Sequence, residues 1–222
     1  MTVLMILRIM KICNLSHSIN SKTPLYGGAN DIIFSSMKDM NCGDSCNESF
    51  VEMRVHASTH VDFPLHFVKD GKSANDYGDH LIYNKIKFIE AHNDKGLINI
   101  NLGDFSDGDI DCVIIKVKNL DRNSADHYLN SPGLSIESAN LLVNNFPNIK
   151  AVMLNTLSIS SYKHRDIGKI VHKIFLEKEI LIYEDLNLND IYVDLRKSLI
   201  LASFVFNDKI DGSPVKIYAI EK

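Results

Sequence analysis

The sequence has no tryptophan, only four cysteines among 222 residues, and no run of basic side chains. The lack of tryptophan disfavours a large aromatic stacking surface. With 24 Lys and Arg against 28 Asp and Glu, and a formal net charge of −4, the chain has no electrostatic basis for binding nucleic acid or an anionic membrane. A glycine-rich phosphate loop and a Gly-x-Ser-x-Gly nucleophile motif are also missing, so a serine hydrolase lacks its nucleophile.

Long hydrophobic runs are absent too. Residues 1–10 are apolar, but Arg8 interrupts them, and a membrane span needs about 20 apolar residues. No basic segment precedes them and no small-residue cleavage site follows, which argues against a signal peptide. We therefore expect an apolar N-terminal extension at 1–10 and a single domain at 11–222. The cysteines, which form no disulfide framework for this size, favour a cytoplasmic protein.

The apolar patterning predicts a strand-rich α/β domain. Continuous apolar runs at 111–117, 151–155 and 180–184 are typical of strands covered on both faces. Helical spacing predicts one helix over 136–146, capped by Ser135, and another that begins near Asp166. Further strands are expected at 31–40, 51–63, 81–90, 97–101, 197–206 and 214–220.

The densest chemistry lies in eleven residues that contain His56, His60, Asp62 and His66. Imidazole nitrogens and carboxylate oxygens together suit zinc, manganese or iron. Apolar and polar side chains alternate over 51–63, which predicts one strand with a wet polar face. The first three of these residues share that face and predict a metal site.

The spacing along this strand requires a bend. Side chains two residues apart on a strand are about 6.6 Å apart, whereas His56 and His60 would be about 13 Å apart in a straight strand. The longer separation does not suit one ion, so we predict a bend or bulge at Ser58 and Thr59. We expect the Thr59 hydroxyl to hold this bend through a hydrogen bond either to a metal ligand or to the backbone.

A zinc finger is a competing interpretation. Cys42 and Cys46, followed by His56 and His60, mimic a two-Cys, two-His site. However, the nine-residue spacer is shorter than the usual spacer of about 12 residues, and the alternation predicts a strand where a finger has a helix. A finger also leaves Asp62 without a role.

Two residues farther along the chain could join the cluster. His172 lies on the second predicted helix, off its apolar stripe, and faces either solvent or the flank of a cleft. Glu184 ends a buried strand, where carboxylates often line the sites of α/β proteins. Because the two lie at opposite ends of one helix–turn–strand unit, they can converge.

The segment from His56 to Phe67 resembles the His-x-Gly-Thr-His-x-Asp-x-Pro-x-His signature of the cyclase-like metal-dependent hydrolases, which include bacterial kynurenine formamidase and isatin hydrolase. The resemblance covers about residues 11–220 and implies an α/β, swivelling β/β/α fold, with a mixed strand-rich sheet or partly open barrel and at least two helices. Similar stretches follow in the family's order at 14–17, 23–28, 131–135, 155–159 and 182–188.

The resemblance also implies roles for individual residues. His56, His60 and Asp62 would bind a divalent metal, zinc or manganese. His172 and Glu184 would complete a site for one or two ions.

His66 would be the catalytic acid or base, and Tyr26 would form part of the pocket for a small-molecule substrate. Two residues depart from the family pattern: Ser58 replaces the usual Gly, and Asn155 replaces a common Asp. The resemblance further suggests a homodimer or a higher homo-oligomer.

These features predict a metal-dependent hydrolase of a small amide, with an aryl-formamide such as N-formylkynurenine as the first candidate. His66 follows Pro64, which ends strand pairing, so it can carry a proton from water to the departing amine without being a ligand. A cyclic amide or lactone, another reaction of the family, and a metal-binding protein without catalysis remain as alternatives. A purely structural metal site does not need His66.

Overall fold

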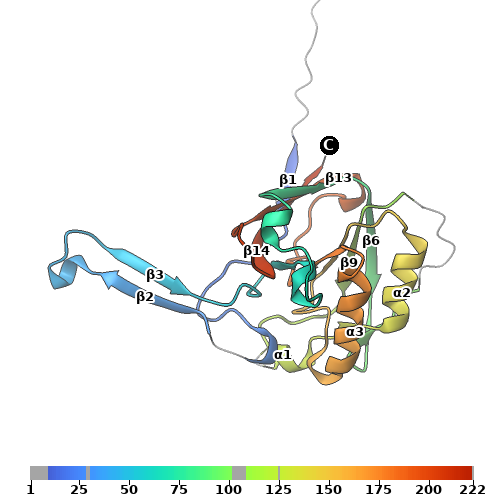
Figure 1. The fold of residues 1–222 in the computed structure, drawn as a ribbon, viewed down its shortest axis with the longest axis horizontal. Helices are drawn as coiled ribbons and strands as arrows, with labels where there is room; N and C mark the ends of the chain where they lie inside the picture. Colours follow the sequence, from blue (N-terminus) through green and yellow to red (C-terminus); the bar gives the residue numbers. More distant parts are fainter. Residues whose placement is uncertain (1–9, 29–30, 102–108, 125, 222) are drawn as a thin grey trace, which may run out of the picture.

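The computed structural model describes residues 10–28, 31–101, 109–124 and 126–221, and its largest element is a nearly closed mixed sheet of nine strands. Eight strands follow the order β5-β13-β14-β4-β12-β11-β9-β6, and β1 pairs with β14 beside this path (Figure 1). The strands are β1 (Lys11–Asn14), β4 (His60–Asp62), β5 (His80–Tyr83), β6 (Ile86–Ala91), β9 (Cys112–Val117), β11 (Ala151–Leu154), β12 (Leu181–Glu184), β13 (Ser198–Phe204) and β14 (Gly212–Glu221).

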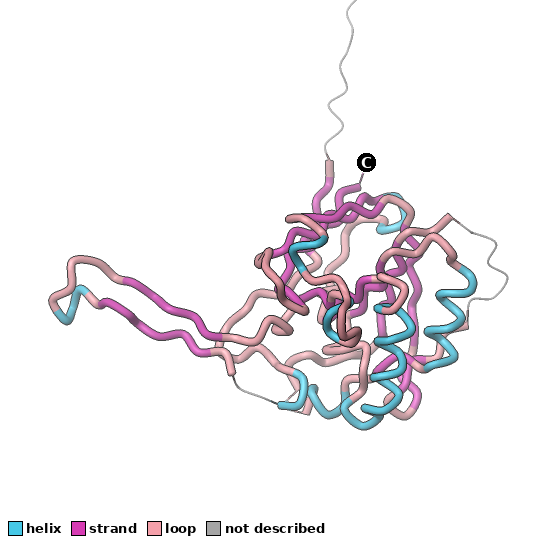
Figure 2. Tube along the Cα trace, in the orientation of Figure 1, coloured by secondary structure: helices cyan, strands magenta, loops and turns pink. Residues whose placement is uncertain are grey.

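One half of the sheet is parallel and carries the helices. Strands β6, β9, β11 and β12 are parallel to one another, and helices α2 (Ile136–Asn145) and α3 (Arg165–Leu176) pack on one face (Figure 2). In β9, Val113 and Ile115 pack toward the helices while Ile114 packs into the core on the other face. Both faces of this strand are therefore covered, as its apolar run predicts.

The other half is antiparallel, and β4 joins the two halves. This short strand pairs antiparallel with β12 on one side and with β14 on the other. Its three residues are all buried. The neighbours of β4 can therefore bring side chains from the end of β12 and the start of β14 to the same place.

A two-stranded hairpin projects from the body of the protein (Figure 1). It consists of β2 (Ile33–Lys38) and β3 (Glu48–Glu52), joined through the short 3₁₀ helix η2 (Met40–Cys42). Every residue of both strands is exposed. Cys42 and Cys46 lie at its exposed end, and no group of possible metal donors among the described residues contains either of them.

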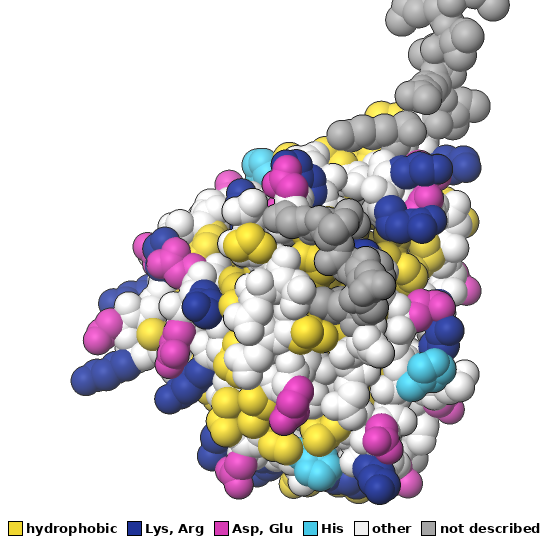
Figure 3. Space-filling model, turned by 90° about the vertical axis from the view of Figure 1, so that its right-hand side faces the viewer, with side chains coloured by type: hydrophobic (Ala, Val, Ile, Leu, Met, Phe, Trp, Pro, Cys, Tyr) yellow, Lys and Arg dark blue, Asp and Glu magenta, His cyan; other side chains and the backbone are white. Residues whose placement is uncertain are grey.

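The remaining elements are small. Strands β7 (Asn93–Asp94), β8 (Leu97–Ile98) and β10 (Gly133–Leu134) form a second sheet, and α1 (His127–Asn130) is one turn long. The other 3₁₀ helices are η1 (Tyr26–Gly28), η3 (Pro64–His66), η4 (Ala74–Asp76), η5 (Tyr162–His164) and η6 (Leu195–Lys197). Acidic and basic side chains are interspersed on the face shown in Figure 3, and none of the described helices has the length and hydrophobicity to cross a membrane.

The predicted α/β class and both main helices are confirmed. Ser135 caps α2, because its hydroxyl accepts a hydrogen bond from the Ser138 amide. Three strand predictions were wrong in extent: the expected strand over 81–90 divides into β5 and β6, the one at 97–101 keeps only Leu97–Ile98, and the one over 51–63 divides into β3 and β4. Of the predicted N-terminal extension at 1–10, only Met10 lies within the described residues.

Candidate active site

The predicted single strand over 51–63 is two strands, and the break between them forms one wall of the site. Strand β3 ends at Glu52 and β4 begins at His60, with irregular backbone between them. Ser58 has a φ of 61°, in the left-handed region that costs a non-glycine residue about 1–2 kcal/mol. The chain bends at Ser58 and Thr59, so the predicted bend is confirmed.

Thr59 fixes the bend to two other segments. Its hydroxyl donates to the Asp185 carbonyl at 2.6 Å and accepts from the His17 amide at 2.9 Å. Beyond the bend, the expected wet face is buried, because His60 is 3% and Asp62 only 1% exposed. The rings of His56 and His60 are 5.2 Å apart, far closer than a straight strand allows.

Pairing with β4 brings distant residues to the cluster. His60 lies opposite Glu184 of β12, and Asp62 lies opposite Gly212 of β14. The His56 ring packs on Gly212, where an added Cβ would approach His56 Cε1 to 2.4 Å. Only a glycine therefore leaves room for His56 in this position.

His60 and His172 are oriented for metal binding. The Nδ1 of His60 bonds to the Ser58 carbonyl at 2.8 Å, and the Nδ1 of His172 bonds to the Gly168 carbonyl at 2.7 Å. A carbonyl only accepts, so in both rings Nδ1 carries the proton. When the ring is neutral, Nε2 is left with a lone pair, which is how proteins fix metal-binding histidines.

Both free nitrogens face carboxylates. The His60 Nε2 lies 3.4 Å from Asp62 Oδ1 and 3.3 Å from Glu184 Oε2. The His172 Nε2 lies 3.5 Å from Asp62 Oδ2 and 3.7 Å from Glu184 Oε1. Two neutral imidazoles that point lone pairs at two carboxylates repel them unless a proton or a cation lies between.

The oxygen Asp62 Oδ2 supports a cation at this place. It is buried and has no hydrogen-bond partner among the described residues, and an unpaired buried carboxylate oxygen is costly. A second carboxylate oxygen and imidazole nitrogens surround it, which is a donor set that suits zinc or manganese. The residues present therefore fit a divalent metal.

The ionisation of these groups is strongly shifted. Burial alone lowers the pKa of His172, but the carboxylates of Asp62 and Glu184 raise it to about 9, and they raise the pKa of His60 well above its usual value. Burial raises the pKa of Asp62 and Glu184, yet the surrounding histidines hold both below their usual values. The site therefore holds protons on histidines where a bound cation would replace them.

His56 differs from the other two histidines. Its Nδ1 lies 2.8 Å from Asp62 Oδ1, and its Nε2 lies 2.8 Å from Asp211 Oδ2. Both nitrogens donate in this arrangement, and although burial lowers its pKa, the two carboxylates raise it to about 9. A cation held by His56 and Asp62 together would take the place of the shared proton.

Glu184 is held by the turn after β11. The Ile159 amide and the Ser158 hydroxyl donate to its Oε1 at 2.6 and 3.0 Å, which leaves Oε2 directed at His60. Asn155 in the same turn does not touch the donor set; its amide accepts from the Val117 amide and donates to the Val117 carbonyl. An aspartate could not make the second of these bonds, so this departure from the family pattern suits the backbone here.

His66 lies at the end of η3 rather than in an open loop, beside the donor set. Its Nδ1 is 2.8 Å from Asp211 Oδ2, the oxygen that His56 also contacts. Geometrically, His66 belongs to two of three possible donor groups among the described residues: His56–His66–Asp211 and Asp62–His66–His172. Its ring therefore lies close enough either to move a proton or to bind a metal.

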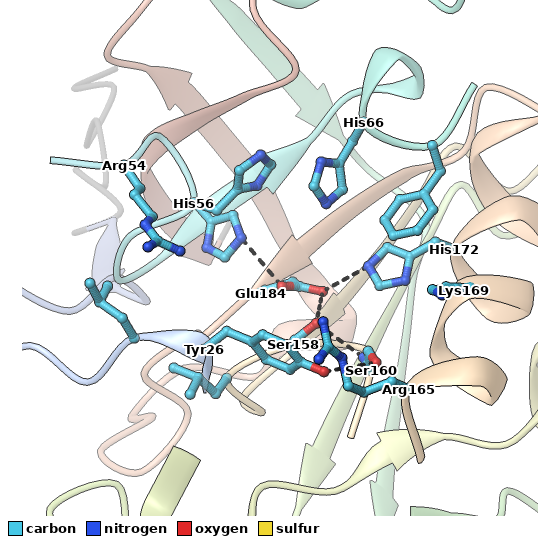
Figure 4. Close-up of a pocket in the computed structure, with 14 residues that line it drawn as sticks. Tyr26, Arg54, His56, His66, Ser158, Ser160, Arg165, Lys169, His172 and Glu184 are labelled. Carbon is cyan, nitrogen blue, oxygen red and sulfur yellow. Dashed lines mark hydrogen bonds and ion pairs between the residues drawn. The ribbon is translucent and has the colours of Figure 1, made fainter. Parts of the chain in front are cut away.

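A cavity of about 260 Å³ opens over this cluster. Figure 4 shows His66 and His172 pointing toward the space in which Glu184 lies. Tyr26 lines the cavity, and its hydroxyl is 3.3 Å from the Ser160 hydroxyl. The remaining lining residues are Leu25, Arg54, His56, His60, Phe67, Leu157, Ser158, Arg165 and Lys169.

The structure brings together every residue that the sequence placed in the site. His172, which the sequence alone left facing either solvent or a cleft, is 3% exposed. Sequence reasoning missed Asp211, because nothing near it in the sequence marks a site. It also missed the basic residues of the lining. Arg165 and Lys169 precede His172 by seven and three residues on α3, so helical spacing would have placed them on the same face as His172.

Comparison with known proteins agrees with this geometry. The model of the family described as "Putative cyclase" matches residues 13–161. Cyclase-like protein 3 of Arabidopsis thaliana is 26% identical over 205 residues, which cover 83% of this chain and 71% of that protein.

Solved structures share the fold at low identity. Isatin hydrolase A from Labrenzia aggregata, bound to benzyl benzoate, superposes with a TM-score of 0.72 at 16% identity and covers 96% of this chain and 94% of its own. A potential metal-dependent hydrolase with cyclase activity superposes with a TM-score of 0.69 at 21% identity and covers 96% and 99%.

Proposed function

Because the chain belongs to the cyclase family, we propose that it is a metal-dependent hydrolase that cleaves the C–N bond of a small amide. One observation carries the proposal: a set of histidines and carboxylates, among them the buried Asp62 Oδ2 that has no hydrogen-bond partner among the described residues, lies beneath a cavity of small-molecule size. An aryl-formamide is the first candidate substrate. A cyclic amide is the second, because one solved protein of this fold is an isatin hydrolase.

The proposed ligands are His56, His60, Asp62, His172 and Glu184, for one or two zinc or manganese ions. When bound, such an ion supplies Lewis acidity: it polarises the scissile carbonyl and acidifies a water molecule. The protein's own contribution is orientation, because the Ser58 and Gly168 carbonyls fix the rings of His60 and His172.

His66 is the proposed proton carrier. Asp211 accepts a hydrogen bond from its Nδ1, which leaves Nε2 of the neutral ring as the basic nitrogen. From this position His66 takes a proton from the attacking water and passes it to the departing nitrogen. Amide cleavage needs such a transfer, because an amine leaves as the neutral molecule.

Metal analysis combined with a substrate panel tests the proposed function. We expect one or two zinc or manganese ions per chain, hydrolysis of an aryl-formamide or a cyclic amide, and loss of turnover after chelation that the metal restores. Bound metal without hydrolysis of any amide or lactone would establish the non-catalytic alternative. A purified chain that binds neither metal contradicts the proposal.

We also propose that the chain forms a homo-oligomer through the β2–β3 hairpin. An isolated two-stranded hairpin is marginally stable in water, yet this one exposes Ile33, Phe34, Met37, Phe50 and Val51. In the strand register, Phe34 pairs with Val51 while Phe50 pairs with Ser35, so apolar side chains lie on both faces. Symmetric exchange of this arm between two copies buries both arms at once.

Light scattering coupled to size exclusion measures this assembly. We expect the wild type to elute at a multiple of the chain mass, and Phe34→Ser with Phe50→Ser to shift it to the monomer. Ile170→Ser, which removes an exposed apolar side chain from α3, is the control and should leave the mass unchanged. A monomeric wild type, or a double variant that keeps the wild-type mass, contradicts the proposal.

A further inference from the structure

The charges that line the cavity are unbalanced. Apart from the proposed metal-binding residues and His66, its charged side chains are Arg54, Arg165 and Lys169, and all three are basic. The chain as a whole has more acidic than basic residues, so the lining does not simply reflect composition. A basic lining favours a substrate that carries a negative charge.

The three basic residues differ in their carboxylate partners. The Arg54 guanidinium forms an ion pair with Asp31. No carboxylate among the described residues pairs with Arg165, whose guanidinium lies 5.7 Å from the centre of the Tyr162 ring. Lys169 Nζ is 3.8 Å from Asp166, in a pair whose side chains are 65% and 100% exposed, and such exposed pairs contribute little.

Helix α3 places Arg165 and Lys169 in the lining of the same cavity as His172. Arg165, Lys169 and His172 are separated by four and three residues, which places them on one face of the helix (Figure 4). Lys169 and Arg165 precede His172 by about 4.5 and 10.5 Å along the helix axis. Both residues therefore line the cavity from the same helix that supplies His172 to the donor set.

We propose that Arg165 and Lys169 bind a carboxylate of the substrate, and that the amide cleaved here is therefore anionic. This assignment rests on the proposed function. The planar guanidinium offers two parallel donors to a carboxylate, and the ammonium adds a second charge. An uncharged amide or lactone has no negative charge for either residue to neutralise.

A matched pair of substrates tests the assignment: an aryl-formamide that bears a carboxylate side chain, and its methyl ester. For the carboxylate, the double variant Arg165→Gln with Lys169→Gln should raise KM by about 10-fold or more, with kcat changed less than about twofold. The ester should show no such rise. Added salt should raise KM for the carboxylate alone in the wild type.

Lys173→Gln is the control, because it removes one positive charge from the same helix outside the cavity. Equal changes in KM for the carboxylate and the ester, or no change for either, would overturn the assignment.

A binding measurement separates this inference from the proposed function. The arylamine that bears the same carboxylate cannot be hydrolysed, so its affinity can be measured by calorimetry on metal-free protein. If no amide is cleaved but the wild type binds this amine at least 10-fold more tightly than the double variant, the anion site stands and the proposed function fails. Equal affinity in both proteins overturns the anion site.

Discussion

Replacing His66 with alanine is expected to lower kcat by about 10²–10⁴-fold while leaving the metal content and the fold intact. The reason lies in its contacts. His66 Nδ1 bonds to Asp211, and its ring lies beside Asp62 and His172 without being buried among them. Removing it therefore takes away the proton carrier but keeps the rings of His60 and His172 in place.

Metal content decides between the two roles that the geometry allows His66. Inductively coupled plasma emission spectroscopy of His66→Ala should measure the wild-type amount of metal per chain. Its circular dichroism spectrum should match that of the wild type. If the variant loses one ion per chain, His66 is a ligand. If the variant keeps full activity, His66 is neither a ligand nor the proton carrier.

Asp211→Asn separates orientation from chemistry. An asparagine keeps an oxygen that can accept from His66 but removes the charge, so we expect a smaller loss of activity than in His66→Ala. Asp208→Asn is the matched control, because Asp208 is an exposed carboxylate of the same loop. It should behave as the wild type.

Local sequence patterns predicted most of the elements because each pattern reflects burial of that segment alone. The apolar run of β9 and the helical spacing of α3 required no knowledge of distant residues. The prediction of one strand over 51–63 was wrong because its structure depends on distant residues. The alternation of this segment is that of a strand, but Ser58 adopts a left-handed φ. Thr59 holds this turn through Asp185, 126 residues away in the chain.

The site residues also fall into those that the local sequence predicted and those that it did not. His56, His60 and Asp62 stand close together in the sequence, so their density alone predicted a metal. Asp211 joins them only because β14 pairs with β4 in a register that places Gly212 opposite Asp62. Pairings between distant strands leave no local pattern, and for this reason the partner of His66 could not be read from the sequence.

Asp62→Asn is expected to abolish stoichiometric metal binding and, with it, turnover. The two oxygens of Asp62 face both metal-oriented histidines, Oδ1 toward His60 and Oδ2 toward His172. An asparagine offers a neutral oxygen and an NH₂ group, which binds no metal. Since the side chain has nearly the same shape, the loss comes from charge and donor type rather than from a cavity.

Thermal unfolding with and without metal measures this effect independently of activity. A ligand at 100 times its Kd stabilises the folded state by about 2.7 kcal/mol, and each kcal/mol shifts the Tm of a chain of this size by about 2–4 °C. We therefore expect zinc or manganese to raise the wild-type Tm by roughly 5–10 °C and to leave that of Asp62→Asn unchanged.

Asp166→Asn is the control, because Asp166 is a fully exposed carboxylate, and it should keep the wild-type response to metal. Glu184→Gln serves as the second variant if Asp62→Asn does not fold, because Glu184 faces the same two histidines. A wild-type Tm that does not respond to any divalent metal means that the carboxylates and histidines stabilise one another as a network of ion pairs. A full response in both variants means that the metal binds elsewhere.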